Sequence, residues 1–254
     1  VYPVVGHWVW AGRAEGETWG WLSSQGFVDF AGATVFHGVA GGFALALLIL
    51  VKPRMGRFTT KGSAINLPKS SPAMVAMGTL LLWLGWFGLV SGQAIHFDVA
   101  IDALFANILI AGAVGTVAVI PIALLFRSGQ IEGELLLNGA LAGLVAVTAG
   151  IHVFGARQVI VVALVGAWLM LTAREVLTRN RIDDVTGAVP IHLISGFWGT
   201  IAVGLLGSPD VLGTGLGSSS QLLIQLVGAC AIAGVSFLVS LICLNVVNLI
   251  FTLR

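Results

Sequence analysis

Long apolar segments with almost no charge recur along this 254-residue chain and limit the folds that it can adopt. An α-helix needs about 20 apolar residues to cross a hydrocarbon core about 30 Å thick. Because apolar residues make up 57% of the chain and charged residues only 9%, such segments follow one another almost without a break. The sequence therefore predicts an all-α, polytopic membrane helix bundle and excludes a soluble globular domain. The predicted spans are about 29–52, 72–95, 100–126, 133–153, 157–178, 186–207 and 221–252.

Charge and cysteine content exclude several other classes of protein. One domain, residues 1–254, accommodates all seven spans, and residues 1–10 resemble the end of a further apolar segment, so we expect more of the protein upstream. A net charge of +1 offers no basic surface for nucleic acid. Cys230 and Cys243 lie thirteen residues apart in one apolar run, a spacing that indicates neither a disulfide nor a metal site. We interpret both as packing residues.

The basic residues predict how the chain is oriented, because lysine and arginine favour cytoplasmic loops. Ten of the twelve fall on one side of the predicted spans, and only Arg13 and Arg157 fall on the other. We therefore expect a multi-pass protein of the inner (cytoplasmic) membrane with a cytoplasmic C-terminus. The ten are Lys52, Arg54, Arg57, Lys61, Lys69, Arg127, Arg174, Arg179, Arg181 and Arg254.

Two of the spans carry the same skeleton, Asp-x7-His-x3-Gly. If each aspartate begins a continuous α-helix, eight residues at about 1.5 Å rise place its histidine about 12 Å deeper. Because the charge bias makes the two spans enter from opposite faces, we expect the histidines to meet near the midplane, as in an inverted-repeat transporter. The residues are Asp29, His37 and Gly41 in the first span and Asp184, His192 and Gly196 in the sixth.

The two histidines are the first candidates for chemistry. Two unrelated buried histidines, each bonded to a backbone carbonyl, are the alternative, but the matched depth and flanking residues favour a functional pair. Neutral imidazoles each donate one proton and accept one, so the pair can carry protons or form a polar step in an apolar pore. With no third His, Cys or carboxylate at comparable depth, we expect no metal site and no cofactor.

The polar residues near these spans have simpler interpretations. Asp29 is expected to cap a helix N-terminus, and Asp183 and Asp184 to cap the later helix at its inner end. His96 and His152 are most simply solvated residues of the outer face. The alternative for His96, three residues after Gln93, is a place in an outer vestibule.

The run DFAGATVFH from Asp29 to His37 resembles the signature helix of the ammonium transporter, methylammonium permease and Rhesus superfamily. Four further stretches agree with the family in order, so the resemblance covers nearly the whole chain. They are HWVW (7–10), LGWFG (84–88), NGALAGLVAVTAG (138–150) and IDDVTGAVPIHLISGFWGT (182–200).

The resemblance implies a homotrimeric, channel-like transporter of ammonium and methylammonium, with eleven helices and one hydrophobic pore per subunit, and no enzymatic activity. On this view the chain begins near the end of the fourth helix and stops just after the eleventh. The pore histidines correspond to His37 and His192, and the structurally required aspartate corresponds to Asp29. The resemblance also assigns Trp10 to the outer vestibule, Thr148 to the pore region and Trp86 to the flanking aromatic motif. The alternative for Trp10 is an interfacial belt tryptophan.

The chain also departs from the family pattern. Leu89 stands where the family has a gate phenylalanine, Gln93 where a serine helps to recruit the cation, and Gly187 where an aspartate is common. These departures leave a second function open, an ammonium sensor that conducts poorly and signals to a cytoplasmic regulatory protein or a fused domain. A third alternative is an unrelated ion or gas channel that reuses the fold. The expected partners are thus ammonium or methylammonium, the lipid bilayer and further copies of the chain.

Overall fold

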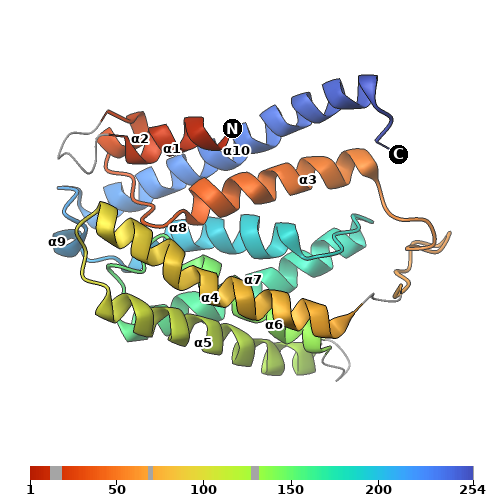
Figure 1. Cartoon of the computed structure of the whole chain (residues 1–254), viewed down its shortest axis with the longest axis horizontal. Helices are drawn as coiled ribbons and strands as arrows, with labels where there is room; N and C mark the ends of the chain where they lie inside the picture. The colour runs from red at the N-terminus through yellow and green to blue at the C-terminus, as the bar shows by residue number, and fades with distance from the viewer. Residues whose placement is uncertain (12–18, 68–70, 127–131, 254) are drawn as a thin grey trace.

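The computed structural model describes residues 1–11, 19–67, 71–126 and 132–253. Within these ranges the regular elements are helices, which lie side by side with their connections at the two ends of the bundle (Figure 1). The predicted all-α bundle is confirmed. The elements are α1 (Tyr2–Trp10), α2 (Trp21–Ser24), η2 (Ala33–Gly38), α3 (Val39–Val51), α4 (Pro72–His96), α5 (Asp102–Phe126), α6 (Gly133–Val147), α7 (Ala156–Arg179), η3 (Val189–Ile194), α8 (Ser195–Leu206), α9 (Pro209–Leu212) and α10 (Ser218–Ile250).

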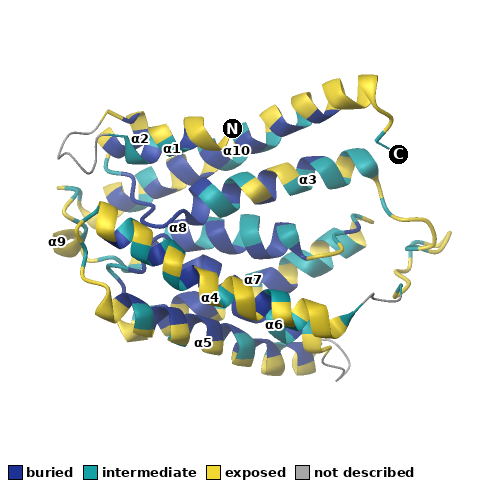
Figure 2. Ribbon diagram, viewed as in Figure 1, coloured by how far each residue is buried: buried dark blue, intermediate teal, exposed yellow. Residues whose placement is uncertain are grey.

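Among the described residues, six helical stretches are long and apolar enough to cross a membrane, one fewer than predicted. The difference is α6, which ends at Val147 and not near residue 153, because a turn begins at Thr148. Eleven of its fifteen residues are buried, so α6 runs through the interior of the bundle (Figure 2). Its apolar sequence therefore serves the protein core more than contact with lipid.

The two histidine-bearing stretches run in opposite directions through the bundle, as the charge pattern predicts. The chain enters η2 and α3 from the end where α2 and α9 lie, whereas η3 and α8 begin at the opposite end (Figure 1). The basic loop after α3 and the segment after α7 lie at that opposite end. Four of the basic residues in the charge count lie outside the described part of the chain: Arg13, Lys69, Arg127 and Arg254.

Neither histidine lies on a continuous α-helix that starts at its aspartate, so the predicted starts at 29 and 186 are wrong. Residues 25–32 form no helix, and the chain then winds as a π-helix through η2 before α3 begins. The second stretch repeats this arrangement, with η3 preceding α8. The depth of about 12 Å, which assumed an α-helical rise, therefore does not hold. Single π-helical turns occur often at functional sites, which draws attention to both segments.

The glycine of each skeleton permits a close crossing of the two stretches. A Cβ atom at Gly41 would lie 2.5 Å from the amide nitrogen of Leu193, the residue after His192. A Cβ atom at Gly196 would overlap the carbonyl oxygen of Ala33 in η2. Only a residue without a side chain fits at either place, and small residues are what let membrane helices approach closely. Each skeleton thus uses its glycine to reach the other.

Candidate functional site

The imidazoles of His37 and His192 lie against each other inside the bundle. Their Nδ1 atoms are 3.1 Å apart, and the rings stack with a centroid distance of 5.1 Å and an interplanar angle of 14°. The predicted proximity of these rings is therefore observed. A hydrogen bond between two Nδ1 atoms requires one to donate and the other to accept. When both rings are neutral, they must consequently hold opposite tautomers.

Trp86 of α4 extends this stack. Its ring lies 5.1 Å from that of His37, with an interplanar angle of only 10°. The indole Nε1 donates to the Thr148 hydroxyl at 3.1 Å, and that hydroxyl donates to the Leu144 carbonyl at 2.7 Å. Thr148 is fully buried, so its hydroxyl is engaged in orienting Trp86. The structure thus places the two residues of the aromatic and threonine motifs on one face of the histidine pair.

The second ring nitrogen of His37 faces a different environment. Its Nε2 is buried, and among the described residues no polar group lies within hydrogen-bonding distance of it. Buried polar atoms in native proteins usually have a partner, and those without one call for an explanation. This nitrogen therefore has an unused hydrogen-bonding position beside the histidine pair.

Asp29 holds the start of η2. Its carboxylate is fully buried, and Oδ1 accepts hydrogen bonds from the amides of Gly32 at 3.0 Å and Ala33 at 2.7 Å. Oδ2 accepts from the Thr34 amide at 2.8 Å, the Thr34 hydroxyl at 2.7 Å and the Val35 amide at 3.0 Å. The carboxylate thereby satisfies the first amides of the helical stretch, which have no partner within the helix. This geometry gives Asp29 a structural role next to the histidine pair.

Asp184 has the corresponding position at the start of η3. Its carboxylate accepts from the amides of Ala188 at 3.0 Å and Val189 at 2.9 Å, and burial raises its pKa above the usual value. Three residues after each aspartate the chain turns through a glycine with positive φ, 91° at Gly32 and 73° at Gly187. This shared Asp-x2-Gly turn was missed in the sequence, although the glycines stand at the same offset. The turn also explains why a glycine stands at position 187, because residues with a side chain rarely adopt that φ.

A hollow of about 450 Å³ opens on one face of α4, near the end of the bundle where α2 and α9 lie. It brings together four residues singled out in the sequence, Trp10, Leu89, Gln93 and His96. The Trp10 Nε1 donates to the Asp29 carbonyl at 2.7 Å, which ties the hollow to the start of η2. The lining residues are Tyr2, Trp10, Gly88, Leu89, Gly92, Gln93 and His96.

The structure corrects the simpler interpretation of one of the two outer histidines. His96 is exposed at the end of α4, as its simpler interpretation predicts, and it also lines this hollow. His152 is only partly exposed and stacks on Phe30 with a centroid distance of 4.3 Å and an interplanar angle of 19°. It therefore packs beside the Asp29 segment and is not a freely solvated residue.

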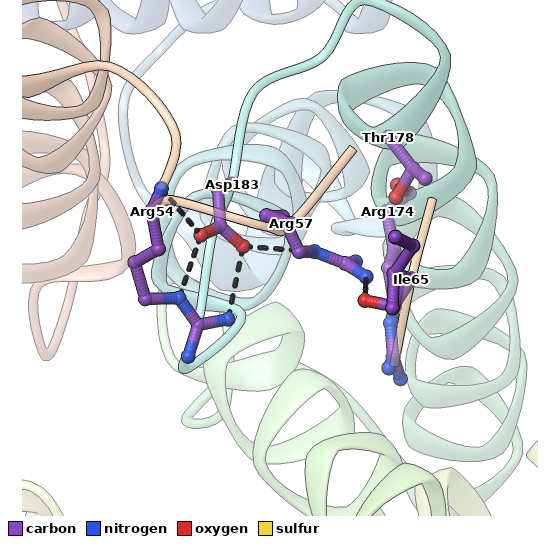
Figure 3. A network of polar contacts seen from close by, with 6 residues as sticks. All are labelled: Arg54, Arg57, Ile65, Arg174, Thr178 and Asp183. Atoms are coloured by element: carbon purple, nitrogen blue, oxygen red, sulfur yellow. Dashed lines mark hydrogen bonds and ion pairs between the residues drawn. The ribbon is translucent and has the colours of Figure 1, made fainter. Parts of the chain in front are cut away.

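Asp183 does not cap a helix, contrary to the prediction. Its carboxylate is 4% exposed and binds Arg54, with Nε at 2.7 Å and Nη2 at 3.1 Å, and the Arg57 Nε at 3.0 Å (Figure 3). Arg57 also donates to the Ile65 carbonyl at 2.5 Å. Arg54 lies three residues after the end of α3, and Asp183 lies just before η3. The cluster therefore joins the segment after α3 to the segment before η3.

We expect the Arg54–Asp183–Arg57 cluster to make stability depend on pH. Burial alone would raise the pKa of Asp183, but the hydrogen bonds and charges of the arginines lower it below the usual value. The cluster therefore stabilises the fold above the pKa of an unfolded aspartate, about 3.9, and this contribution is lost as the pH falls through the lower folded value. Asp183→Asn should melt a few degrees below wild type at pH 7, and this difference should shrink as the pH is lowered toward 3.

Differential scanning fluorimetry of the detergent-purified protein between pH 3 and 8 measures this effect. Asp210→Asn, at an exposed position in the first turn of α9, is the matched control and should melt like wild type at every pH. Equal melting of wild type and Asp183→Asn at pH 7 would show that the cluster does not stabilise the fold.

Comparison with known proteins agrees with this geometry. The model of the Ammonium Transporter Family matches residues 1–254. Ammonium transporter Amt2 of Archaeoglobus fulgidus is 33% identical over 90% of the chain and 52% of its own length, and ammonium transporter 3 of Dictyostelium discoideum is 32% identical over 90% and 55%. Among solved structures, a sensor Amt protein superposes with a TM-score of 0.91 and 30% identity, over 97% of this chain and 61% of that one. Mep2 of Candida albicans superposes with a TM-score of 0.82 and 28% identity, over 98% and 55%.

Each of these matches covers only part of the relative's length. The chain spans about half the length of the curated relatives above, although it is itself matched almost from end to end. The family consists of membrane transporters and not of enzymes. The family match over all 254 residues and the agreement in fold lead to one conclusion: the chain belongs to the ammonium transporter family.

Proposed function

We propose that this chain acts in ammonium transport, and that ammonium or methylammonium passes a step formed by His37 and His192. The observation that supports this most directly is the 3.1 Å contact between the two Nδ1 atoms, made by stretches that run in opposite directions. Family membership supplies the substrate, and the relatives named above are themselves described as ammonium transporters.

The energetics of an apolar passage favour a neutral species at the histidine pair. Moving a bare cation into a low-dielectric interior costs many kcal/mol, whereas ammonia gives up only a few hydrogen bonds. Loss of a proton before the passage is therefore the route of lower energy. The proton must then cross separately, and titratable groups near the substrate path are needed to carry it.

The opposed tautomers of His37 and His192 provide such a carrier. The hydrogen bond between the Nδ1 atoms contains one proton. When that proton moves, the ring that gives it up takes a proton at its Nε2, and the ring that receives it releases its own Nε2 proton. Both rings then remain neutral, and the donor and acceptor roles of the two Nε2 atoms are reversed. The buried Nε2 of His37 then accepts a proton at one stage and donates it at another. The pair works as a proton relay beside the path of ammonia, with Trp86 holding the ring of His37 in place.

The hollow on α4 fits the place where the cation is first bound. Its Trp10 offers an aromatic face for a cation–π contact of about 0.5–2 kcal/mol. The side-chain carbonyl of Gln93 accepts a hydrogen bond from ammonium in place of the family serine, and Leu89 lines the hollow where a phenylalanine is usual. Thr148 acts on the pore indirectly, through Trp86.

Orientation and assembly belong to the same proposal. The basic end of the bundle, with Arg54 and Arg57, faces the cytoplasm of an inner membrane, and the C-terminus lies on that side. The subunit assembles as a homotrimer in the lipid bilayer. In this orientation the hollow on α4 opens toward the outside, where ammonium arrives.

A sensor is the second candidate function. The similarity to a structure titled as a sensor Amt protein favours it, together with Leu89 and Gln93 in place of the usual residues. Such a protein binds ammonium and passes occupancy to a cytoplasmic regulatory protein or a fused signalling domain. Both functions use the same hollow, but only transport requires the histidine step to pass ammonia.

Electrophysiology on proteoliposomes separates the two functions. Ammonium pulses should evoke a transient current that saturates with concentration and grows with the amount of protein in the membrane. Binding of ammonium without current, measured by isothermal titration calorimetry on the same preparation, would favour the sensor. Neither current nor binding would contradict both.

Gln93→Ser should strengthen the capture of ammonium in the hollow. The serine restores the short hydroxyl acceptor of the family and leaves more room beside Trp10. We expect the half-saturating ammonium concentration to fall by a few-fold, with little change in the maximal current. Gln25→Ser, at an exposed position after α2, is the matched control and should leave both values unchanged. An unchanged half-saturating concentration in Gln93→Ser would argue against a binding role for Gln93.

A further inference from the structure

The segment that leads into η2 depends on α10 for its backbone hydrogen bonds. Residues 25–32 form no helix, and most of them are buried. Buried amides and carbonyls must find partners, and in this segment they find them in or next to three other helices. Phe30 and Ala31 donate to carbonyls in the turn that follows α6, and Trp10 of α1 donates to the Asp29 carbonyl. The third helix is α10, which holds Val28 through a side chain.

Gln225 pairs with both backbone groups of Val28. Its Oε1 accepts from the Val28 amide at 2.7 Å, and its Nε2 donates to the Val28 carbonyl at 2.7 Å. One side-chain amide thus supplies the two-way pairing that a neighbouring β-strand would provide. Gln225 lies near the start of an apolar helix and is fully buried, where an unpaired amide would be costly.

The same amide reaches the other histidine-bearing stretch. The Gln225 Nε2 also donates to the Thr200 carbonyl at 3.0 Å, one turn beyond Gly196 on α8. Its Oε1 accepts a second hydrogen bond from the Gln221 Nε2 at 3.2 Å. Both donors and both acceptor positions of Gln225 are therefore used. If the side-chain amide were flipped, its NH2 group would face the Val28 amide and its oxygen would face the carbonyls of Val28 and Thr200. The network therefore fixes the orientation of this amide.

Gln221 completes the network one turn earlier on α10. Its Nε2 also donates to the Gly26 carbonyl at 3.0 Å, and its Oε1 accepts from the Thr214 hydroxyl at 2.6 Å. It is 1% exposed, so these bonds also lie away from solvent. The two glutamines together hold the chain from Gly26 to Val28, directly before the carboxylate that fixes η2.

We propose that Gln225 is a positioning residue for the histidine step: it fixes the segment before Asp29 to α8 and so sets the distance between His37 and His192. This inference rests on the proposed transport function for its consequence, but its structural content stands separately. Gln225 lines neither the hollow nor the imidazole pair. Its loss should therefore impair passage more than capture of the cation.

Gln225→Leu tests this directly, because leucine removes the bonds that Gln225 makes to the backbone groups of Val28 and its additional bond to the Thr200 carbonyl. We expect the maximal ammonium current to fall by at least about tenfold while the half-saturating concentration stays within about twofold. Hydrogen–deuterium exchange should rise in peptides covering 26–38 and 189–200. Asn245→Leu is the matched control, since this exposed amide on α10 bonds only the Leu241 carbonyl of its own helix. It should change neither the current nor the exchange.

Gln225→Glu keeps the size of the side chain and decides the case if the leucine variant does not fold. A carboxylate accepts but cannot donate, so it opposes the carbonyls of Val28 and Thr200. Protonation restores one donor, and the current of this variant relative to wild type should therefore rise as the pH is lowered. A ratio that does not change with pH would overturn the proposal, as would wild-type current and exchange in Gln225→Leu.

The inference and the transport proposal fail in different ways. If the wild-type protein passes no current, the transport proposal fails, and exchange alone then tests Gln225. Faster exchange in 26–38 and 189–200 in Gln225→Leu, with none in Asn245→Leu, would support the positioning role. Unchanged exchange in both would overturn it.

Discussion

Asp29→Ala is expected to prevent the protein from accumulating in a folded form. The substitution removes a buried carboxylate that accepts five hydrogen bonds and leaves four amides and the Thr34 hydroxyl without that partner. Each unpaired buried donor costs about 1–3 kcal/mol, so the total should exceed about 4 kcal/mol even if the segment partly relaxes. This is a large part of the stability of an ordinary domain.

Size-exclusion chromatography of detergent extracts measures this loss as the fraction of monodisperse protein. Asp29→Asn retains one acceptor oxygen and should lie between alanine and wild type. Asp210→Ala, at an exposed site on α9, controls for the loss of an aspartate and should elute like wild type. A monodisperse, conducting Asp29→Ala protein would contradict the structural role given to this carboxylate.

His192→Ala should remove most of the ammonium current and leave the fold intact. The substitution deletes the partner of the His37 Nδ1, so the proton shared by the two rings has nowhere to go. Positioned groups that transfer protons commonly contribute factors of about 10² or more, and we expect a loss on the order of a hundredfold. His37→Ala should cause a similar loss, and the double variant should be little worse, because the pair acts as one unit.

Solid-supported membrane electrophysiology on equal amounts of reconstituted protein measures these losses. His7→Ala is the matched control, since His7 is exposed on α1 and should not affect the current. Wild-type current in His192→Ala would refute the histidine step. A variant that fails to assemble would instead show that His192 is required for the fold, against a purely pore-lining role.

Part of this architecture could be predicted from the sequence alone. The long apolar segments and the uneven basic residues predicted the helix bundle and the opposed directions of the two histidine-bearing stretches. The spacing of Asp, His and Gly predicted that His37 and His192 would meet. These properties depend on local composition and on charge, so a single chain displays them without knowledge of its neighbours.

Other features depend on contacts between distant segments and could not be predicted in this way. Apolar periodicity does not distinguish a lipid-facing helix from a buried one, which is why the span predicted for α6 is too long. The π-helical turns at η2 and η3 were not predicted, because apolar periodicity does not distinguish a π-helical turn from an α-helical one. Asp183 binds arginines that lie more than 120 residues away in the sequence and does not cap the helical stretch that follows it. Gln221 and Gln225 did carry a signal, since two amides one turn apart in the last apolar span require buried partners.

The order of synthesis gives the crossing of Gly41 and Gly196 a consequence for biogenesis. His37 is translated 155 residues before His192, and the glutamines that hold its approach come later still. The ribosome therefore delivers the first half of the site into the bilayer well before its counterpart exists. The hydrogen bonds of this site are complete only when α10 has been inserted, so any interruption of translation before that point leaves an unfinished site.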